Sequence, residues 1–372
     1  MTFRKSAPIT LIVAVVLVIG ALTFLSDRLF SGLTASSEAA QFRLMQSILD
    51  TAIRNAAEQA LARADIIAAL PTTRQAVAAK DRERLLSEFS EMFTVQKERR
   101  GVDQAQFHIL PAQSLLRLHN PPASGDDLTR FRPMVVAVNR EQAARKGLAI
   151  ARRGPAVFGV APIKDPQGKH IGSFEFGLDF ASLLDGLKAA YGLDFAFFVE
   201  EKPLREFARG VNPAILSDQN RVGRFIRFHT TNNAVMQNLA AEADISVVSE
   251  PTRYTRDAQG LPFGVLLIPL RDGAGDSIGV IAVASDFSGS RATAGRILIW
   301  QICLAVFAIV LLAGAIIVTI RGFLLRPLDV INGRFAALAA GDRVAAPENS
   351  VKFCAEIQIL AGLHDKLRRQ GA

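Results

Sequence analysis

The chain has 372 residues, 50% of them hydrophobic, and a formal net charge of +8 at pH 7. This length allows two or three domains. The charge argues against nucleic-acid binding, because most of it lies in residues 1–26, at Arg296 and in residues 321–372, which leaves +2 for residues 27–295. Positive charge beside apolar segments is typical of a membrane protein with both termini in the cytoplasm.

A first membrane span is predicted at the N-terminus. Ile9–Leu25 is a run of 17 uncharged residues that follows Arg4 and Lys5, and a bilayer core needs about 20 apolar residues of helix. We assign residues 1–26 to a cytoplasmic N-terminus and a transmembrane helix in the lipid bilayer. A cleaved signal peptide is the alternative, but no small-x-small cleavage site directly follows Leu25.

Residues 27–102 are predicted to form a helical stalk. Its first helix has apolar residues at four-residue spacing, at Leu44, Ile48, Ala52 and Ala56. Pro71 ends this helix, and Thr72 or Thr73 caps the next one. The second helix has an apolar stripe at Leu85, Phe89 and Phe93 and ends at Gly101.

Two segments after the stalk repeat each other at an offset of 107 residues. Residues 162–172 align with residues 269–279, and Asp179-Phe180 aligns with Asp286-Phe287 without a gap. Each copy predicts a strand, a type I turn with Asp first and Gly last, and a second strand. Chance similarity between hairpins is the alternative. The repeat predicts a membrane-distal module over residues 103–192 and a membrane-proximal module over residues 193–295.

Each module is predicted to be α+β, with a mostly antiparallel sheet because its turns are short. The distal module has predicted strands near residues 106–110, 114–119, 147–152, 156–163 and 169–180. Its predicted helices cover residues 128–142, with a start or a bend at Pro133, and residues 181–191. The proximal module has predicted strands near residues 194–200, 245–250, 262–270 and 276–287, and a helix over 233–242.

A second span and a pair of helices follow. Ile297–Ile320 is a run of 24 uncharged residues, so residues 296–320 are long enough to cross a bilayer. In residues 321–372, two short helices carry apolar seams, the first at Leu328, Ile331, Phe335 and Leu338 and the second at Phe353, Ile357, Leu360 and Leu367. Two short helices cannot bury such seams alone, which predicts a parallel homodimer.

Residues 321–372 resemble a HAMP signal linker. The resemblance is carried by Arg326-Pro327-Leu328, Gly341-Asp342 and Glu356-Ile357, which follow a membrane span. It implies that Pro327, at the start of the first helix, and Glu356, before the second, take part in signal transmission. Gln358 departs from the pattern, because the family usually has glycine after Glu-Ile.

The region between the spans resembles double-Cache sensor domains, which have two PAS-like folds and a long N-terminal helix. The resemblance covers about residues 30–290 and is carried by Phe107-His108, Pro111, residues 114–119, Gly125-Asp126-Asp127-Leu128, Phe131-Arg132, Asn139 and residues 171–175. It implies a ligand in the distal module, on the periplasmic or extracellular side of a bacterial inner membrane. Such receptors normally continue into a kinase, cyclase or methyl-accepting coil. The chain stops at Ala372, so we expect its output module to be absent and a separate kinase or chemoreceptor protein to be a candidate partner.

The two copies differ on one face of their last strand. Ser173, Glu175 and Gly177 of the distal copy align with Val280, Ala282 and Ala284 of the proximal copy. Burying a charge without a partner costs several kcal/mol. Glu175 is therefore expected to face solvent, to meet a cation in the fold or to meet a ligand, and Ser173 lies on the same face.

Arg117 and His119 are expected to share a strand face, because side chains alternate along a strand. An arginine fork suits a carboxylate. This pair, with Arg132 entering the following helix, is predicted to hold an organic acid or the acid end of an amino acid, and a solvated strand face is the alternative. His108 is expected to be structural, and His170 to be exposed beside a turn.

No enzyme motif is present. The sequence has no Gly-x-x-x-x-Gly-Lys-Ser/Thr loop, no His-Glu-x-x-His and no paired cysteines, since Cys303 and Cys354 stand alone. No cofactor, metal or disulfide framework is therefore expected. We expect a transmembrane sensory receptor for a small molecule. The alternatives are a receptor remnant or scaffold that pairs with a separate signalling protein, which a neighbouring reading frame for an output domain would favour, and a membrane-anchored enzyme.

Overall fold

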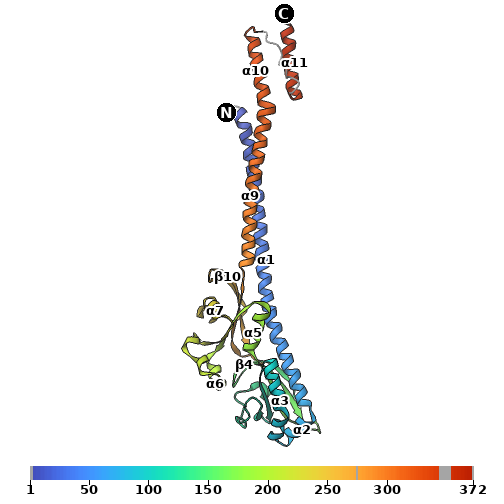
Figure 1. Cartoon of the computed structure of the whole chain (residues 1–372), viewed down its shortest axis with the longest axis vertical. Helices are drawn as coiled ribbons and strands as arrows, with labels where there is room; N and C mark the ends of the chain where they lie inside the picture. Colours follow the sequence, from blue (N-terminus) through green and yellow to red (C-terminus); the bar gives the residue numbers. More distant parts are fainter. Residues whose placement is uncertain (1–2, 274, 343–352, 371–372) are drawn as a thin grey trace. The chain divides into compact units, whose positions relative to one another are not determined.

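A computed structural model describes residues 3–273, 275–342 and 353–370. The chain divides into two units (Figure 1). The sheet unit consists of residues 36–289, and the helical unit consists of residues 1–35 and 290–372. Helix α1 (Phe3–Ala69) contributes residues to both.

Three helices open the sheet unit: the second half of α1, then α2 (Pro71–Ala78) and α3 (Arg82–Arg100). Pro71 takes the first position of α2, where a missing N–H costs nothing. Thr72 and Thr73 therefore lie inside α2, and the prediction that one of them caps it was wrong. Helix α3 starts at Asp81, whose side chain accepts a hydrogen bond from Arg84 N at 3.0 Å, and it ends at Gly101, as predicted.

The buried face of α1 repeats every three or four residues, at Phe42, Met45, Leu49, Ala56, Ala60 and Ala64. The prediction placed Leu44 at the start of this buried stripe. Leu44 is instead 59% exposed, and the buried residue is its neighbour Met45. The helix comes closest to the sheet at Gly159, where a Cβ atom would overlap the backbone of Leu61. Small residues on both sides, Ala60 and Gly159, make this close approach possible.

The first sheet has five antiparallel strands in the order β2-β1-β5-β4-β3. They are β1 (Val102–Ile109), β2 (Gln113–Arg117), β3 (Arg145–Ala151), β4 (Gly154–Lys164) and β5 (His170–Asp179). One face packs on α1, α2 and α3 through Phe107, Phe174 and Phe176. The other face packs on α4 (Pro133–Glu141). Of the two predicted alternatives, a start or a bend at Pro133, the structure has the start.

The second sheet has six antiparallel strands in the order β7-β8-β6-β11-β10-β9. They are β6 (Asp194–Glu200), β7 (Arg221–Val222), β8 (Phe225–Thr230), β9 (Thr252–Ala258), β10 (Leu261–Arg271) and β11 (Ser277–Asp286). Its helices are α5 (Phe180–Tyr191), α6 (Glu201–Phe207), α7 (Asn233–Leu239) and α8 (Glu242–Ile245), with short 3-10 turns at Pro213–Leu216 and Asp218–Asn220. The strand predicted over residues 245–250 was wrong. Val247 is 77% exposed, and the strand begins at Thr252.

The sequence repeat corresponds to equivalent hairpins in the two sheets. Pro162 pairs with Ser173, and Pro269 pairs with Val280 in the same way. The register of each hairpin shifts shortly after its proline, directly before Lys164 in the first and Arg271 in the second. The turns match as well, since Gly168 N donates to Asp165 O and Gly275 N donates to Asp272 O. Gly172 and Gly279 occupy equivalent positions, where a Cβ atom would overlap the carbonyl oxygens of His108 and Phe198.

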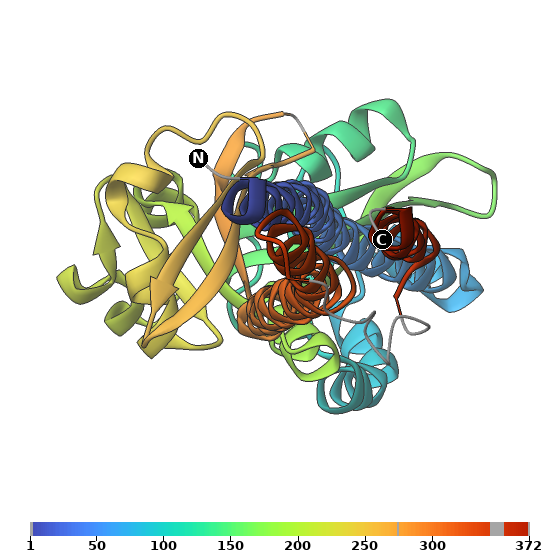
Figure 2. The same ribbon diagram turned by 90° about the horizontal axis from the view of Figure 1, so that it is seen from above.

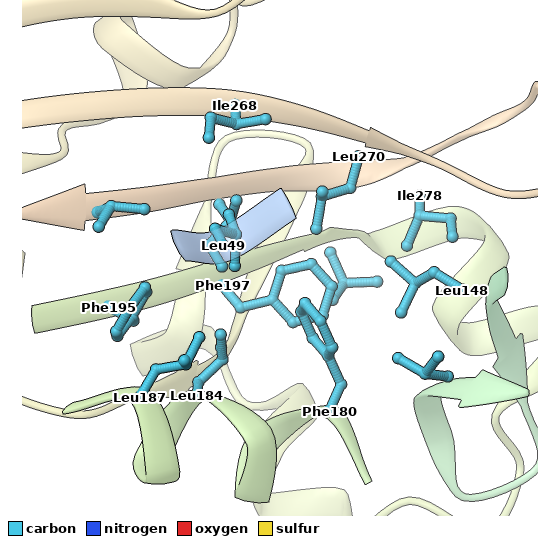
Figure 3. Close-up of a cluster of buried hydrophobic side chains, with 14 of the residues drawn as sticks. Leu49, Leu148, Phe180, Leu184, Leu187, Phe195, Phe197, Ile268, Leu270 and Ile278 are labelled. Carbon is cyan, nitrogen blue, oxygen red and sulfur yellow. The ribbon is translucent and has the colours of Figure 1, made fainter. Parts of the chain in front are cut away.

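A large apolar cluster joins α1 to the second sheet. Figure 3 shows Leu49 of α1 beside Phe195 and Phe197 of β6, with Ile268 and Leu270 of β10 above them and Phe180, Leu184 and Leu187 of α5 below. Leu148 of β3 belongs to the same cluster. The first and second sheets therefore share a core with the long helix.

The helical unit contains the two apolar segments. Its helices after α1 are α9 (Ser288–Thr319), α10 (Arg326–Ala339) and α11 (Ala355–Gln370), with a π-helical stretch over Ile320–Leu325. Within the part of the chain that the structure describes, two helices, α1 and α9, have segments long and apolar enough to cross a membrane. The two run side by side within this unit (Figure 1, Figure 2), and Gln301 Nε2 donates to Ser26 Oγ at 2.8 Å.

Helices α10 and α11 pack through part of the predicted seams. Ile331 of α10 and Ile357 of α11 are buried, and the rings of Phe335 and His364 meet edge to face at 5.1 Å. The outer seam positions Leu360 and Leu367 of α11 are exposed. Pro327 is buried in the first turn of α10, and Glu356 is exposed in the first turn of α11.

Candidate functional site

The register of the first sheet places three polar side chains in one row on the face that α4 covers. Gln106 in β1 pairs with Arg117 in β2 and with Glu175 in β5, and the row continues through Val160 in β4 to Arg145 in β3. Directly opposite residues on one face have Cβ atoms about 5 Å apart. Arg117, Gln106 and Glu175 are all buried. They form a buried polar row on this face of the sheet.

Glu175 meets a cation from the fold. It is 1% exposed, and its carboxylate accepts a hydrogen bond from Nη2 of Arg132, which is also buried and directly precedes α4. The guanidinium of Arg132 lies 4.1 Å from the centroid of the Phe158 ring, a cation–π contact. Burial raises the pKa of Glu175, and the charge of Arg132 opposes that rise. The sequence left three possibilities for Glu175: solvent, a cation within the fold or a ligand. In the structure it meets a cation within the fold, Arg132.

Ser173 lies in the next row with His108. The two residues pair in register, and His108 Nδ1 is 3.2 Å from Ser173 Oγ. Burial, followed by the charges of Arg132 and Arg117, lowers the pKa of His108 well below 6.5. Its Nε2 lies 3.9 Å from Glu175 Oε1, too far for a hydrogen bond. The ring is therefore neutral at pH 7, which agrees with the expected structural role.

Arg117 holds a loop against the sheet. Its Nη1 and Nη2 donate to Oδ1 and Oδ2 of Asp126 at 2.6 and 2.9 Å, and Nη1 also donates to the carbonyl oxygen of Ala123. Partial burial acts to raise the pKa of Asp126, but the hydrogen bonds and charge of Arg117 outweigh it, so the pKa is lowered. A bidentate pair fixes geometry, and this one fixes residues 118–127 over the polar row.

A pocket of about 70 Å³ lies between this loop, the polar row and the segment that follows β6. Its lining includes Gln104, Gln106, Arg117, His119, Asp126, Phe131 and Arg132, and the exposed Arg152, Glu206 and Arg209. Among the described residues, the buried Nε2 of Gln106 has no hydrogen-bond partner. A buried donor without a partner costs about 1–3 kcal/mol, so this atom is a candidate contact for a ligand.

His119 adds a neutral ring to the pocket. Its Nδ1 lies 3.2 Å from the carbonyl oxygen of Ala105. Burial lowers the pKa of His119 to about 4, although the hydrogen bond to Ala105 opposes the shift. The ring is therefore uncharged at pH 7, and the positive charge of the pocket comes from arginine alone.

The second sheet has an apolar layer at the equivalent positions. The shared register aligns Gln106 with Ala196, His108 with Phe198, Ser173 with Val280, and Glu175 with Ala282. All four residues of the second sheet are buried in one hydrophobic cluster. The corresponding layer of the second sheet is thus built without buried charges at these positions.

The structure brings Arg117, His119 and Arg132 to one pocket and places Ser173 and Glu175 in the layer behind it. His170 was expected to be exposed beside a turn, and this prediction was wrong. It is 7% exposed, because it is the first residue of β5, paired with Lys164, and not part of the turn.

Several polar residues of the pocket, among them Gln104, Gln106, Asp126, Glu206 and Arg209, were not predicted as site residues from the sequence. Gln104, Gln106 and His108 alternate along β1, so polar side chains with a period of two could have revealed Gln106. No local signal could have revealed Asp126 as the partner of Arg117, because the two meet only when the loop closes.

Comparison with known proteins identifies the sheet unit. The dCache_3 family, described as the double sensory domain of two-component sensor kinases, matches residues 36–289. No curated protein matches the sequence.

Several solved structures are similar to this part of the chain. The periplasmic domain of Vibrio cholerae LuxQ is 12% identical, with 67% of this chain and 99% of that chain covered and a TM-score of 0.39. The ligand-binding domain of the Campylobacter jejuni chemoreceptor Tlp3 with L-valine is 11% identical, with 70% and 96% covered and a TM-score of 0.42. The same sensory domain with isoleucine bound is 10% identical, with 70% and 96% covered and a TM-score of 0.40.

Proposed function

Because this chain belongs to the family of double sensory domains of two-component sensor kinases, we propose that it is a transmembrane receptor for a small carboxylate. The ligand binds in the pocket of the first sheet, outside the inner membrane of a bacterium. The signal passes inward through α9 to α10 and α11. The observation that supports this best is the buried row Arg117–Gln106–Glu175. At the positions of Gln106 and Glu175, the second sheet has the buried Ala196 and Ala282.

Arg132 and Arg117 supply the positive charge for the carboxylate, and Gln106 supplies a free donor. Both arginines already have an acidic partner, Glu175 and Asp126. They are therefore held in place before the ligand arrives, and preorganised donors lose little entropy on binding. Ser173 supports the site from behind through His108.

The packing offers a route from the pocket to α9. Arg132 directly precedes α4, and Met134 of α4 lies beside Gly273 in the turn between β10 and β11. A Cβ atom added at Gly273 would lie 3.6 Å from Met134 Cε. Strand β11 ends at Asp286, two residues before α9 begins. A shift of α4 on ligand binding would thus reach α9 through one hairpin, the kind of small displacement that receptors transmit.

Helices α10 and α11 would act as a HAMP-like linker in a homodimer. The packing of Ile331 against Ile357 and the exposed Leu360 and Leu367 fit helices that bury further apolar surface against a second copy. Pro327 and Glu356 mark the starts of the two helices. A separate kinase or chemoreceptor protein would receive the signal.

A ligand screen tests the proposal. The purified full-length chain in detergent is heated with small organic acids, amino acids and amines. A carboxylate present at about 100 times its Kd stabilises the folded state by about 2.7 kcal/mol, which raises the Tm of a domain of this size by about 5–10 °C.

Gln106→Leu is the decisive variant, because it removes the free donor and keeps the volume. We expect it to abolish the ligand-induced shift without lowering the Tm of the free protein, and we expect Arg117→Ala to abolish the shift as well. Gln96→Leu is the matched control, since Gln96 Oε1 is also buried without a partner among the described residues but lies on α3. Stabilisation by amines alone, or an unchanged shift in Gln106→Leu, would overturn the proposal.

A further inference from the structure

The charges around the pocket select among carboxylates. Among the described residues, four arginines and two acids line it, which gives two net positive charges. Glu175, behind Arg132, lowers this to one. His119 and His108 add none, because both rings are neutral at pH 7. The site as a whole therefore complements a ligand with net negative charge.

The acids inside the pocket are already occupied. Both carboxylate oxygens of Asp126 accept hydrogen bonds from Arg117, and Glu175 is buried against Arg132. Glu206 is the remaining acid of the lining, and it lies exposed, in the same lining as the exposed Arg152 and Arg209. An ammonium group donates three hydrogen bonds and carries a full positive charge. Among the described residues, the pocket interior holds no unpaired carboxylate to receive it.

A hydroxyl group has a different requirement. It donates one hydrogen bond and accepts others, and the side-chain amides of Gln104 and Gln106 offer both functions on the pocket wall. The Nε2 of Gln106 is a buried donor without a partner. The pocket of about 70 Å³ is also far smaller than the roughly 300–1,000 Å³ that holds a drug-sized ligand, so the ligand has few non-hydrogen atoms.

We propose that the ligand is a small hydroxy acid rather than an amino acid. The carboxylate would lie between Arg132 and Arg117, and the hydroxyl would bond to Gln106. This inference rests on the proposed function, because it assumes that a carboxylate binds in this pocket.

Matched pairs of ligands test it on the full-length chain by calorimetry. L-lactate and L-alanine share a three-carbon skeleton and differ in a hydroxyl against an ammonium group, and glycolate and glycine form a two-carbon pair. We expect each hydroxy acid to bind at least tenfold more tightly than its amino-acid counterpart. Gln106→Leu should remove this difference together with the binding. Glu206→Gln should tighten lactate binding, because it removes a like charge from the rim.

The outcomes are distinguishable. Equal or tighter binding of alanine and glycine would overturn the hydroxy-acid inference and leave the carboxylate site in place. If Glu206→Gln then abolished alanine binding, the ammonium group would lie beside Glu206. If no carboxylate binds the full-length chain while another class of molecule does, both the inference and the proposed function fail.

Discussion

At the scale of single residues, the main feature is a charged pair buried in the layer beneath α4. Glu175 and Arg132 are both buried, and Arg132 also lies over the ring of Phe158. A buried ion pair gains little over well-packed apolar residues, but losing one partner leaves an unpaired charge in the core. The equivalent of Glu175 in the second sheet is Ala282. An apolar layer is thus compatible with the fold.

This contrast gives a prediction for Glu175. Glu175→Ala should lower the free energy of unfolding by about 3–5 kcal/mol, because Arg132 would lose its buried partner. The double variant Arg132→Met with Glu175→Ala should recover most of this loss. Denaturant unfolding of the full-length chain measures both. Glu141→Ala is the control, since Glu141 pairs with Arg140 and Arg145 at the surface, where losing an ion pair has little effect on stability. Equal losses in Glu175→Ala and Glu141→Ala would contradict the prediction.

At the scale of elements, glycine decides how closely α1 approaches β4. A Cβ atom at Gly159 would overlap the backbone of Leu61, and backbone cannot rotate away as a side chain can. Ala60 and Ala64 of α1 are fully buried on the same side of the helix. The contact therefore depends on small residues in both elements, and it sets the distance between the long helix and the first sheet.

We expect Gly159→Ala to lower the free energy of unfolding by about 1–3 kcal/mol or more, because the extra methyl group must push α1 away from the sheet. Thermal unfolding of the full-length chain measures the effect. Gly186→Ala in α5 is the matched control. Nothing lies within 4 Å of a Cβ there, and alanine stabilises a helix interior by about 0.5–1 kcal/mol relative to glycine. The account of the α1 contact would be wrong if the two variants unfolded at the same temperature.

The elements also show how far local sequence patterns reach. The hairpins of the repeat were predicted with their turns, because Asp and Gly at fixed positions specify a type I turn locally. The strand over residues 245–250 was predicted wrongly, since a short apolar run such as Ile245, Val247 and Val248 fits a strand and an irregular turn equally well. Packing decided between the two: Ile245 is buried at the end of α8 and Val247 is exposed.

At the scale of the whole molecule, the chain combines a double sensory domain with two helices apolar enough to cross a membrane. The apolar faces of α9 are exposed over most of its length, for example at Ile299, Leu304 and Val310. Exposed side chains of this kind are stable in lipid and costly in water. This supports α9 as a segment that crosses a membrane.

Cysteine labelling tests the proposed topology. In a background with Cys303 and Cys354 replaced by serine, Ser249→Cys places a thiol on the sensory domain and Lys366→Cys places one on α11. A membrane-impermeant maleimide should label Ser249→Cys in spheroplasts and Lys366→Cys only after permeabilisation. Labelling of Lys366→Cys in sealed spheroplasts, or protection of Ser249→Cys, would exclude the proposed orientation.

The sequence by itself determined the features that depend on local composition and spacing. The two apolar segments, the repeated hairpins and the polar residues that set the first copy apart from the second were all readable, because hydrophobic length, turn chemistry and strand alternation act over a few neighbouring residues. Only the tertiary structure decided what those polar residues do. Arg132 and Glu175 lie 43 residues apart in the chain, and the row formed with Gln106 and Arg117 exists only because the strand order brings β2, β1 and β5 together in one register.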